Sequence, residues 1–345
     1  MKIISFNVGT THLMHFNQKI IHPTGETVQN KNNRAKLIKF NILSSVNNEN
    51  ADILCIQEGF NEVLPPKYSN LTKINFYEVK HGFIGGYNSS FLATYVNPEK
   101  FMFNEDNNFD REYKENYGNH PCRTQIFILT EINTNKNTVL VNFHGVGSPD
   151  TSIRIILLRF LSNYLKRVYN NNDVVIVGDI NTNLRIRNGN QDEIVFARVL
   201  RNVFFNDFDI FPKDDKKKSS YHRFIREDDN SFTDKLPQFR YDCLDYCLVK
   251  KDMKKEVIVK RIPKNFIGKE VPYKLDINNT IKPNFDEFPS DHTLNIYNIK
   301  NKKNSSMSKV RRIKSKQSKK ARSTSNSRKS SRNSKRKTKS RRVSF

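Results

Sequence analysis

Short apolar runs, separated by polar or helix-like stretches, constrain the fold of the first 299 residues more than any other feature. Several of these runs are rich in Ile, Val, Leu and Phe, and they have the length of buried strands. We expect strands over residues 2–8, 52–57, 89–96, 125–131, 138–143, 173–177, 241–249 and 294–299. Strands that alternate with helices and hairpins predict an α/β or α+β domain.

The clearest helix is predicted over residues 152–169. Its apolar side chains recur at intervals of three and four residues from Ile153 to Val168, which gives one apolar stripe. Further helices are predicted over residues 35–46 and 193–205. The polar stretch 206–240 contains a run of lysines and is interpreted as a long loop that shapes the substrate groove.

Composition changes sharply at Lys300. From there to Phe345 the chain has 20 Lys and Arg residues and no acidic residue, so this segment carries most of the net charge of +25. It cannot bury enough apolar surface to offset the entropy lost on ordering. We therefore expect one domain over residues 1–299 and a disordered basic tail over residues 300–345. The dense positive charge of the tail favours attraction to nucleic acid. This binding should be independent of sequence, since the tail has no aromatic residue before Phe345 on which bases could stack. A nuclear-import address and a solubilising segment are the alternatives.

The sequence also bounds the location of the protein. No run approaches the ~18 apolar residues that would span a membrane. The start MKIISFNVGT is typical of a strand rather than a signal peptide. We expect an intracellular protein of the nucleus or cytoplasm that is not secreted. Its Asn and Lys content indicates an AT-rich genome, which viruses, protozoa and bacteria all provide.

The four cysteines form no Cys-x-x-Cys pair, so a zinc site is not predicted. Cys243 and Cys247 are interpreted as small core residues on one face of a strand.

Polar side chains stand at or near one end of almost every predicted strand. One such residue is usually a turn or cap residue. Six coincidences along one chain instead indicate a shared site. The residues concerned are Asn7, Glu58, His144, Asp179, Asn181, Asp245, Asp291 and His292.

These residue types favour a particular chemistry. Carboxylate and amide oxygens are hard ligands that suit Mg²⁺, with Mn²⁺ as an alternative. The two histidines suit proton transfer and phosphate contact near neutral pH. Hydrolysis of a phosphodiester needs both, because a cation and imidazolium groups offset the negative charge that develops on phosphate oxygens.

Six motifs in order resemble the endonuclease/exonuclease/phosphatase superfamily, whose best-known type is DNase I-like. They are Ser5-Phe6-Asn7, Ile56-Gln57-Glu58, Asn142-Phe143-His144, Gly178-Asp179-Ile180-Asn181, Leu244-Asp245-Tyr246 and Ser290-Asp291-His292. The resemblance covers residues 1–299. It implies a four-layer α/β/β/α sandwich, in which two mostly antiparallel sheets pack face to face between helices, with the site at one edge.

The resemblance also implies roles. Glu58 would bind the metal with Asn7 and Asp291 close by, and Asp179 and Asn181 would orient and activate the attacking water. Asp245 would fix the tautomer of His292. His144 would contact the phosphate or protonate the leaving oxygen, and its presence argues against the apurinic endonuclease branch. Phosphate contacts are expected from Arg123, Asn181 and His292.

One feature departs from the family pattern. Some DNase I-like members have a glutamate near the histidine on the leaving-group side, and Asn88-Ser89-Ser90-Phe91 has no acid there. The role of His144 as a general acid is therefore left open.

Three functions are compatible with the sequence. The first is a Mg²⁺-dependent nuclease, assumed monomeric, acting on DNA or RNA. The second is a phosphatase or phospholipase of the same fold, acting on inositol phosphates or sphingomyelin. The third is a nucleic-acid-binding or packaging protein with an inactive site. The complete set of polar residues argues against the third, and the basic tail favours the first.

Overall fold

The computed structural model describes residues 1–9, 28–83, 86–117, 123–146, 151–187, 191–213, 220–224, 238–262, 273–275, 281–283, 290 and 292–302. The chain divides into two units, Met1–Lys300 and Asn301–Phe345. Only residues 301 and 302 of the second unit are described, so the expected tail lies almost wholly outside the described residues. In the part of the chain that is described, no helix combines the length and apolar character required to cross a membrane.

One sheet of the first unit has seven strands. Their spatial order is β14 (Lys255–Ile262), β17 (Leu294–Asn301), β1 (Lys2–Asn7), β2 (Ile53–Gly59), β5 (Gly86–Val96), β4 (Leu71–Phe83) and β3 (Lys67–Tyr68). β1 pairs with β2 in parallel and with β17 in antiparallel orientation, so segments from the two ends of this unit lie side by side.

The other sheet has six strands. Their order is β10 (Phe208–Phe211), β13 (Asp245–Lys250), β9 (Asp173–Asp179), β8 (Lys136–His144), β7 (Thr124–Glu131) and β6 (Phe101–Glu105). Only the β8–β9 pair is parallel among the pairs of this sheet with described register. Two short ribbons complete the described strands, β11 (Ser220–Phe224) with β12 (Gln238–Asp242), and β15 (Tyr273–Leu275) with β16 (Ile281–Pro283).

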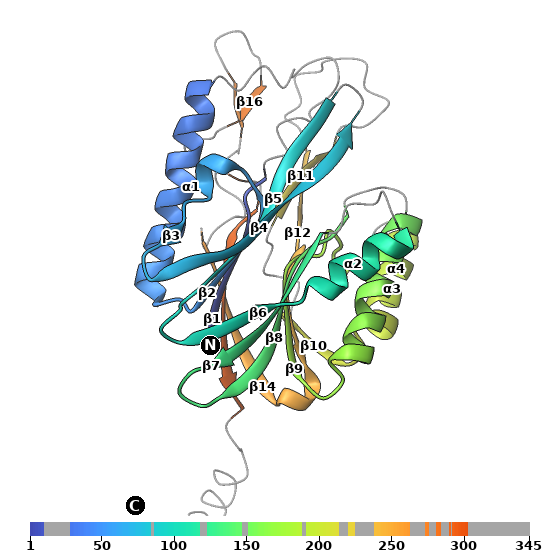
Figure 1. Ribbon diagram of the computed structural model, residues 1–345. Coiled ribbons are helices and arrows are strands. Elements are labelled where there is room, and N and C mark those ends of the chain that lie inside the picture. The colour runs from blue at the N-terminus through green and yellow to red at the C-terminus, as the bar shows by residue number, and fades with distance from the viewer. Residues whose placement is uncertain are drawn as a thin grey trace, which may run out of the picture. The chain divides into compact units, whose positions relative to one another are not determined.

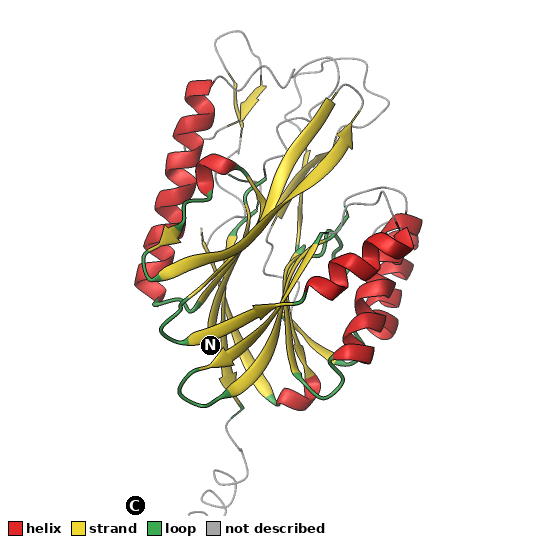
Figure 2. Ribbon diagram, viewed as in Figure 1, coloured by secondary structure: helices red, strands yellow, loops and turns green. Residues whose placement is uncertain are grey.

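Helices cover the outer faces of the sheets (Figures 1 and 2). α1 (Val28–Glu49) lies against the seven-stranded sheet, and the six-stranded sheet is covered by α2 (Asn107–Tyr117), α3 (Thr151–Val168) and α4 (Gln191–Val199). Short helical turns occur at η3 (Asn61–Val63), η5 (Lys251–Met253) and the π-helical η4 (Leu200–Phe204).

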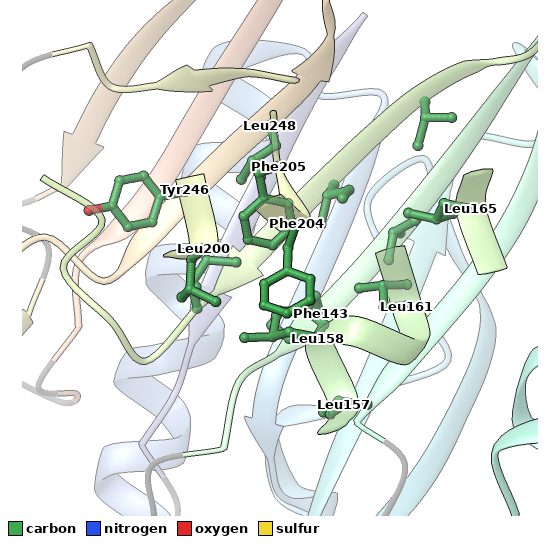
Figure 3. Packing of buried hydrophobic residues seen from close by; sticks show 14 of the residues in the cluster. Phe143, Leu157, Leu158, Leu161, Leu165, Leu200, Phe204, Phe205, Tyr246 and Leu248 are labelled. Carbon is green, nitrogen blue, oxygen red and sulfur yellow. The ribbon is translucent and has the colours of Figure 1, made fainter. Parts of the chain in front are cut away.

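Three apolar layers hold this arrangement together. Alternate residues of a strand point to opposite faces; on β2, Leu54 therefore packs towards α1 while Cys55 packs between the sheets. Ile38 and Ile42 of α1 complete the first outer layer. The other outer layer lies between α3 and the six-stranded sheet, where Leu157, Leu158, Leu161 and Leu165 meet Phe143 and Leu248 (Figure 3). The expected α/β/β/α sandwich is confirmed.

Several expected boundaries were wrong. Residues 206–240, interpreted as a loop, include β10, β11 and part of β12. These short strands lie among polar residues and lack a strong alternation of polar and apolar side chains, so the sequence pattern does not predict them. The expected strand 241–249 is two strands, β12 and β13, interrupted at Cys243 and Leu244. The two cysteines therefore do not share one strand face: Cys243 precedes β13 and belongs to a different apolar cluster from Cys247, which packs between the sheets.

Candidate active site

The six-stranded sheet places three of the expected residues in one row. Asp179 ends β9, and its Cα pairs with His144 of β8 on one side and with Asp245 of β13 on the other. The same faces of these strands carry Leu140, Val175 and Val177 in the layer between the sheets. Period-two alternation thus turns the polar row inwards, towards the other sheet.

The seven-stranded sheet supplies Asn7 and Glu58. Asn7 follows Ile3 and Ser5 at alternate positions and points between the sheets by the same rule. Glu58 would point towards α1 by alternation, since Leu54 and Ile56 do. A register shift between Ile56 and Gly59 and a φ of 50° at Glu58 instead mark a bulge. The bulge re-aims the Glu58 side chain into the site.

Asn7 joins the two sheets at the centre of the site. Its Nδ2 donates to Asp179 Oδ2 at 2.9 Å and lies 3.4 Å from Glu58 Oε1. Its Oδ1 accepts from the backbone N–H of Gly9 at 2.9 Å, which fixes the orientation of the amide. Ser290 Oγ donates to the Asn7 carbonyl at 2.8 Å and accepts from the His292 N–H at 3.1 Å, so the segment before β17 is fastened to β1.

Each histidine faces a carboxylate. His292 Nδ1 lies 2.8 Å from Asp245 Oδ2, which leaves Nε2 directed to Asp179 Oδ2 at 3.6 Å. His144 Nε2 lies 3.1 Å from Glu58 Oε1 and 4.0 Å from Asp179 Oδ2. Glu58 thus places a carboxylate beside His144, although the stretch at Asn88 provides none.

Asn181 is held in a fixed pose by the turn after β9. It has a φ of 53°, its N–H donates to Asp179 Oδ1 at 2.6 Å, and its Nδ2 donates to the Gly145 carbonyl at 2.7 Å. Gly145 N–H in turn donates to the Asp179 carbonyl at 2.6 Å. The loops that follow β8 and β9 are thus hydrogen-bonded to each other beside the site.

Arg123 also lies at this edge. It precedes β7, its carbonyl accepts from the His144 N–H at 2.9 Å, and its Nη1 lies 3.4 Å from the Gly145 carbonyl. Asp291 lies outside the described residues. The structure brings together all the expected site residues that it describes, and their individual roles stay predictions.

Burial dominates the electrostatics of the cluster. It raises the pKa of Asp179 to about 6; the neighbouring His292 lowers that pKa and Asp245 raises it. Like charges directly opposite each other on adjacent strands repel, which accounts for the effect of Asp245.

Arg154 of α3 is a residue that the sequence analysis missed, because it lies outside the apolar stripe of the predicted helix. Its Nη2 donates to the Asn181 carbonyl at 2.7 Å and to Thr182 Oγ1, and its guanidinium lies over the Phe196 ring at 4.5 Å. Burial lowers the pKa of Arg154, while Glu193 and Asp179 oppose that shift. Arg154 therefore fastens the Asn181 turn to both α3 and α4.

A buried amide network beneath the site was also missed. Asn142 Oδ1 accepts from Gln57 Nε2 at 2.7 Å across the two sheets. Asn142 Nδ2 lies 3.1 Å from both Thr94 Oγ1 and Gln125 Oε1, and Gln57 Nε2 lies 3.2 Å from Ser5 Oγ. Buried amides need such partners, so the network fixes the register of one sheet against the other. Its only signal in the sequence is the pair of amides just before Glu58 and His144.

The donor chemistry fits a hard divalent cation. Glu58 and Asp179 present carboxylate oxygens beside the Asn7 amide, in a buried setting that raises the pKa of Asp179. Among the described residues, no group of three or more His, Cys, Asp or Glu is arranged to hold a metal ion. Mg²⁺ is compatible with that, because it keeps several waters and takes only one or two protein carboxylates.

Solved structures share this fold at low sequence identity. One is the human Nocturnin catalytic domain with bound sulfate, which is 11% identical with a TM-score of 0.51, over 87% of this chain and 94% of that one. Another is an endonuclease/exonuclease/phosphatase from Bacteroides vulgatus, 14% identical with a TM-score of 0.50, over 87% and 98%. A comparison with curated protein sequences finds no match.

The model of the Endonuclease/Exonuclease/phosphatase family matches residues 6–292. That match spans every residue of the candidate site, from Asn7 to His292, and all the described strands except β17 and most of β1. The chain belongs to the Endonuclease/Exonuclease/phosphatase family, whose members hydrolyse phosphoester bonds.

Proposed function

We propose that this protein is a Mg²⁺-dependent phosphodiester hydrolase that cleaves nucleic acid. The observation that carries the proposal is the meeting of Glu58, Asp179 and two carboxylate-paired histidines at one end of the inter-sheet layer. Carboxylates and imidazoles in one buried cluster provide a cation site, a base and proton donors together.

Each residue has a role that its contacts support. Asp179 accepts a proton from the attacking water, and Asn181, held to Gly145 and Asp179, orients that water. His292 is held by Asp245 with its Nε2 towards the site, where it binds the phosphate and stabilises negative charge. His144, beside Glu58, contacts the phosphate or donates a proton to the leaving-group oxygen.

Glu58, with Asp291 as a predicted second ligand, would hold the cation; Asn7, expected as a ligand, instead turns its Nδ2 to Glu58 and Asp179 and would position these carboxylates. Bound there, it would supply positive charge that offsets the charge of the phosphate oxygens. Arg123 at the same edge is proposed to add a contact to the phosphate.

Two features favour nucleic acid as the substrate. The chain from Lys300 onwards has 20 basic and no acidic residues, which suits a phosphate backbone. In the β11–β12 ribbon, the backbone register pairs Tyr221 with Tyr241 and Arg223 with Phe239. Aromatic rings and guanidinium groups are the groups on which bases stack, and β12 leads within three residues into Asp245.

A substitution at Asp179 tests the function. Purified protein with Mg²⁺ should cleave plasmid DNA or oligonucleotides, and EDTA should stop the reaction. Asp179→Asn should lower kcat by roughly 10³-fold or more without loss of the fold, because the water loses its base. Asp110→Asn, which alters an exposed ion pair with Lys114, is the matched control and should keep full activity.

The outcomes separate the alternatives. Asp179→Asn protein with wild-type activity would contradict the assignment of the base. Turnover of inositol phosphates or sphingomyelin without cleavage of DNA or RNA would favour the phosphatase or phospholipase reading. Binding of nucleic acid with no turnover of any phosphoester would favour a packaging protein.

A further inference from the structure

Asp245 and His292 come from different sheets, so the distance between them depends on how the sheets are held at this point. Asp245 begins β13 of the six-stranded sheet, and His292 precedes β17 of the seven-stranded sheet. Their hydrogen bond of 2.8 Å therefore requires a fixed separation between two strands that share no backbone ladder. A connection between these strands, apart from the pair itself, would set that separation.

Arg261 makes this connection. It lies near the end of β14, next to β17, and only 7% of its surface is exposed. Its Nε donates to Asn295 Oδ1 on β17 at 2.7 Å, and its Nη2 donates to the backbone carbonyl of Asp245 at 3.2 Å. One guanidinium thus binds both β17, the strand that follows His292, and Asp245, the residue that is hydrogen-bonded to His292.

The neighbours of Arg261 keep it charged. Burial by itself lowers the pKa of an arginine, but Cys243, Tyr297 and Asp245 together raise the pKa of Arg261. Its Nη2 also lies 3.4 Å from Cys243 Sγ. A buried cation next to a buried carboxylate offsets the charge of Asp245. Asp245 therefore binds Arg261 through its backbone carbonyl and the His292 ring through its carboxylate.

We propose that Arg261 is a positioning residue that sets the place of the Asp245 carboxylate and, through it, of the His292 ring. The proposal rests on the hydrolase function above and adds a residue that touches neither substrate nor cation. The guanidinium is suited to this task because its rigid fork reaches acceptors on two strands at once, which a lysine ammonium cannot do with fixed geometry.

Kinetics of single and double variants test this role. Arg261→Met should lower kcat roughly 10- to 100-fold with little change in KM, because a small displacement of a catalytic group acts on the transition state. Arg261→Lys should lose less, since it keeps the charge. Asp245→Asn combined with Arg261→Met should be no slower than Asp245→Asn alone to within about twofold, because Arg261 acts through Asp245.

Lys250→Met is the matched control. Lys250 ends the strand that Asp245 begins. Its Nζ donates to the carbonyl of Asn172, a residue that follows α3, at 3.2 Å. Its loss should lower Tm and leave kcat unchanged. A general loss of stability and a loss of positioning are thereby separated.

A spectroscopic readout does not depend on activity. In protein labelled with ¹⁵N-histidine, the Nδ1 proton of His292 should give a downfield signal that is missing in His292→Gln. Arg261→Met should shift or broaden it, and Lys250→Met should not. If the wild type cleaves no substrate, the proposed function fails while this signal still tests Arg261. An unshifted signal with wild-type kcat in Arg261→Met, or additive losses in the double variant, would overturn the proposal; should Arg261→Met not fold, the same criteria apply to Arg261→Lys.

Discussion

At the level of single residues, the site depends on carboxylates kept in a setting that disfavours their charge. Asp179 is buried between two histidines and opposite Asp245. Such a group titrates closer to neutral pH than an exposed aspartate, which suits a base that must accept a proton and release it again.

The pH dependence of the reaction follows from this burial. Burial raises the pKa of Asp179 to about 6, and the base acts only when ionised, so kcat/KM should fall as pH drops through that pKa, by about tenfold per pH unit. A bound cation favours the ionised form, so the midpoint is expected between about pH 4, the ordinary aspartate pKa, and about pH 6. A pH–rate profile with circular dichroism at each pH, to check folding, would measure this. A rate that stays flat down to about pH 4, near the ordinary aspartate pKa, would contradict it.

Alternation along the strands accounts for most of what could be predicted at this scale. Asp179 follows Val175 and Val177 at period two, and Asn7 and His144 share a strand face with Ile3 and Leu140, so their direction follows from alternation once the strands are assigned. Glu58 was found by its position, but its direction depends on a bulge and a φ of 50°. No hydrophobic pattern encodes such a conformation.

At the level of elements, the loops after β8 and β9 approach so closely that one position requires glycine. A Cβ built on Gly145 would lie 2.3 Å from the Ile180 carbonyl oxygen. The obstacle is backbone, which cannot rotate away as a side chain can.

Gly145→Ala should therefore push the Asp179–Asn181 turn out of place. We expect a loss of about 1–3 kcal/mol in the free energy of unfolding and a larger fall in kcat than in stability would explain. Gly59→Ala is the control, because its added Cβ would meet only Leu64 and Ile56 side chains, at 3.1 Å and beyond. Denaturant unfolding and kcat of both variants measure the difference. Equal effects at the two positions would argue against a special approach at Gly145.

Contacts between distant elements limited the sequence analysis. The helix at 152–169 was expected, yet nothing in its periodicity assigns Arg154 to the turn at Asn181 rather than to solvent. Arg261 was not predicted as a site residue, because β14 was not expected and the hydrogen-bond partners of Arg261 are 16 and 34 residues away in the chain. β11 and residues 238–240 of β12 were missed because neither stretch shows a regular alternation of polar and apolar residues.

At the level of the whole molecule, the basic tail should govern affinity and leave the chemistry unchanged. Removal of residues 303–345 deletes 18 Lys and Arg residues. DNA binding should weaken and its dependence on salt should become shallower, since fewer counterions are released. kcat on a small diester such as bis(4-nitrophenyl) phosphate should not change.

A scrambled tail with the same composition provides the control. It should bind DNA as the wild type does, because attraction to phosphates does not depend on residue order. Fluorescence anisotropy across a salt series would measure both variants. Unchanged affinity and salt slope after removal of the tail would contradict this role.

The order of the strands in the two sheets has a consequence for synthesis. A growing chain acquires Asn7, Glu58, His144, Asp179 and Asp245 long before His292, which precedes the last strand of the first unit. That strand inserts between β14 and β1, so the seven-stranded sheet stays incomplete until it arrives. A ribosome-bound or prematurely terminated chain that stops short of His292 and β17 would therefore lack a complete site, and any activity would have to wait for the final residues of this unit.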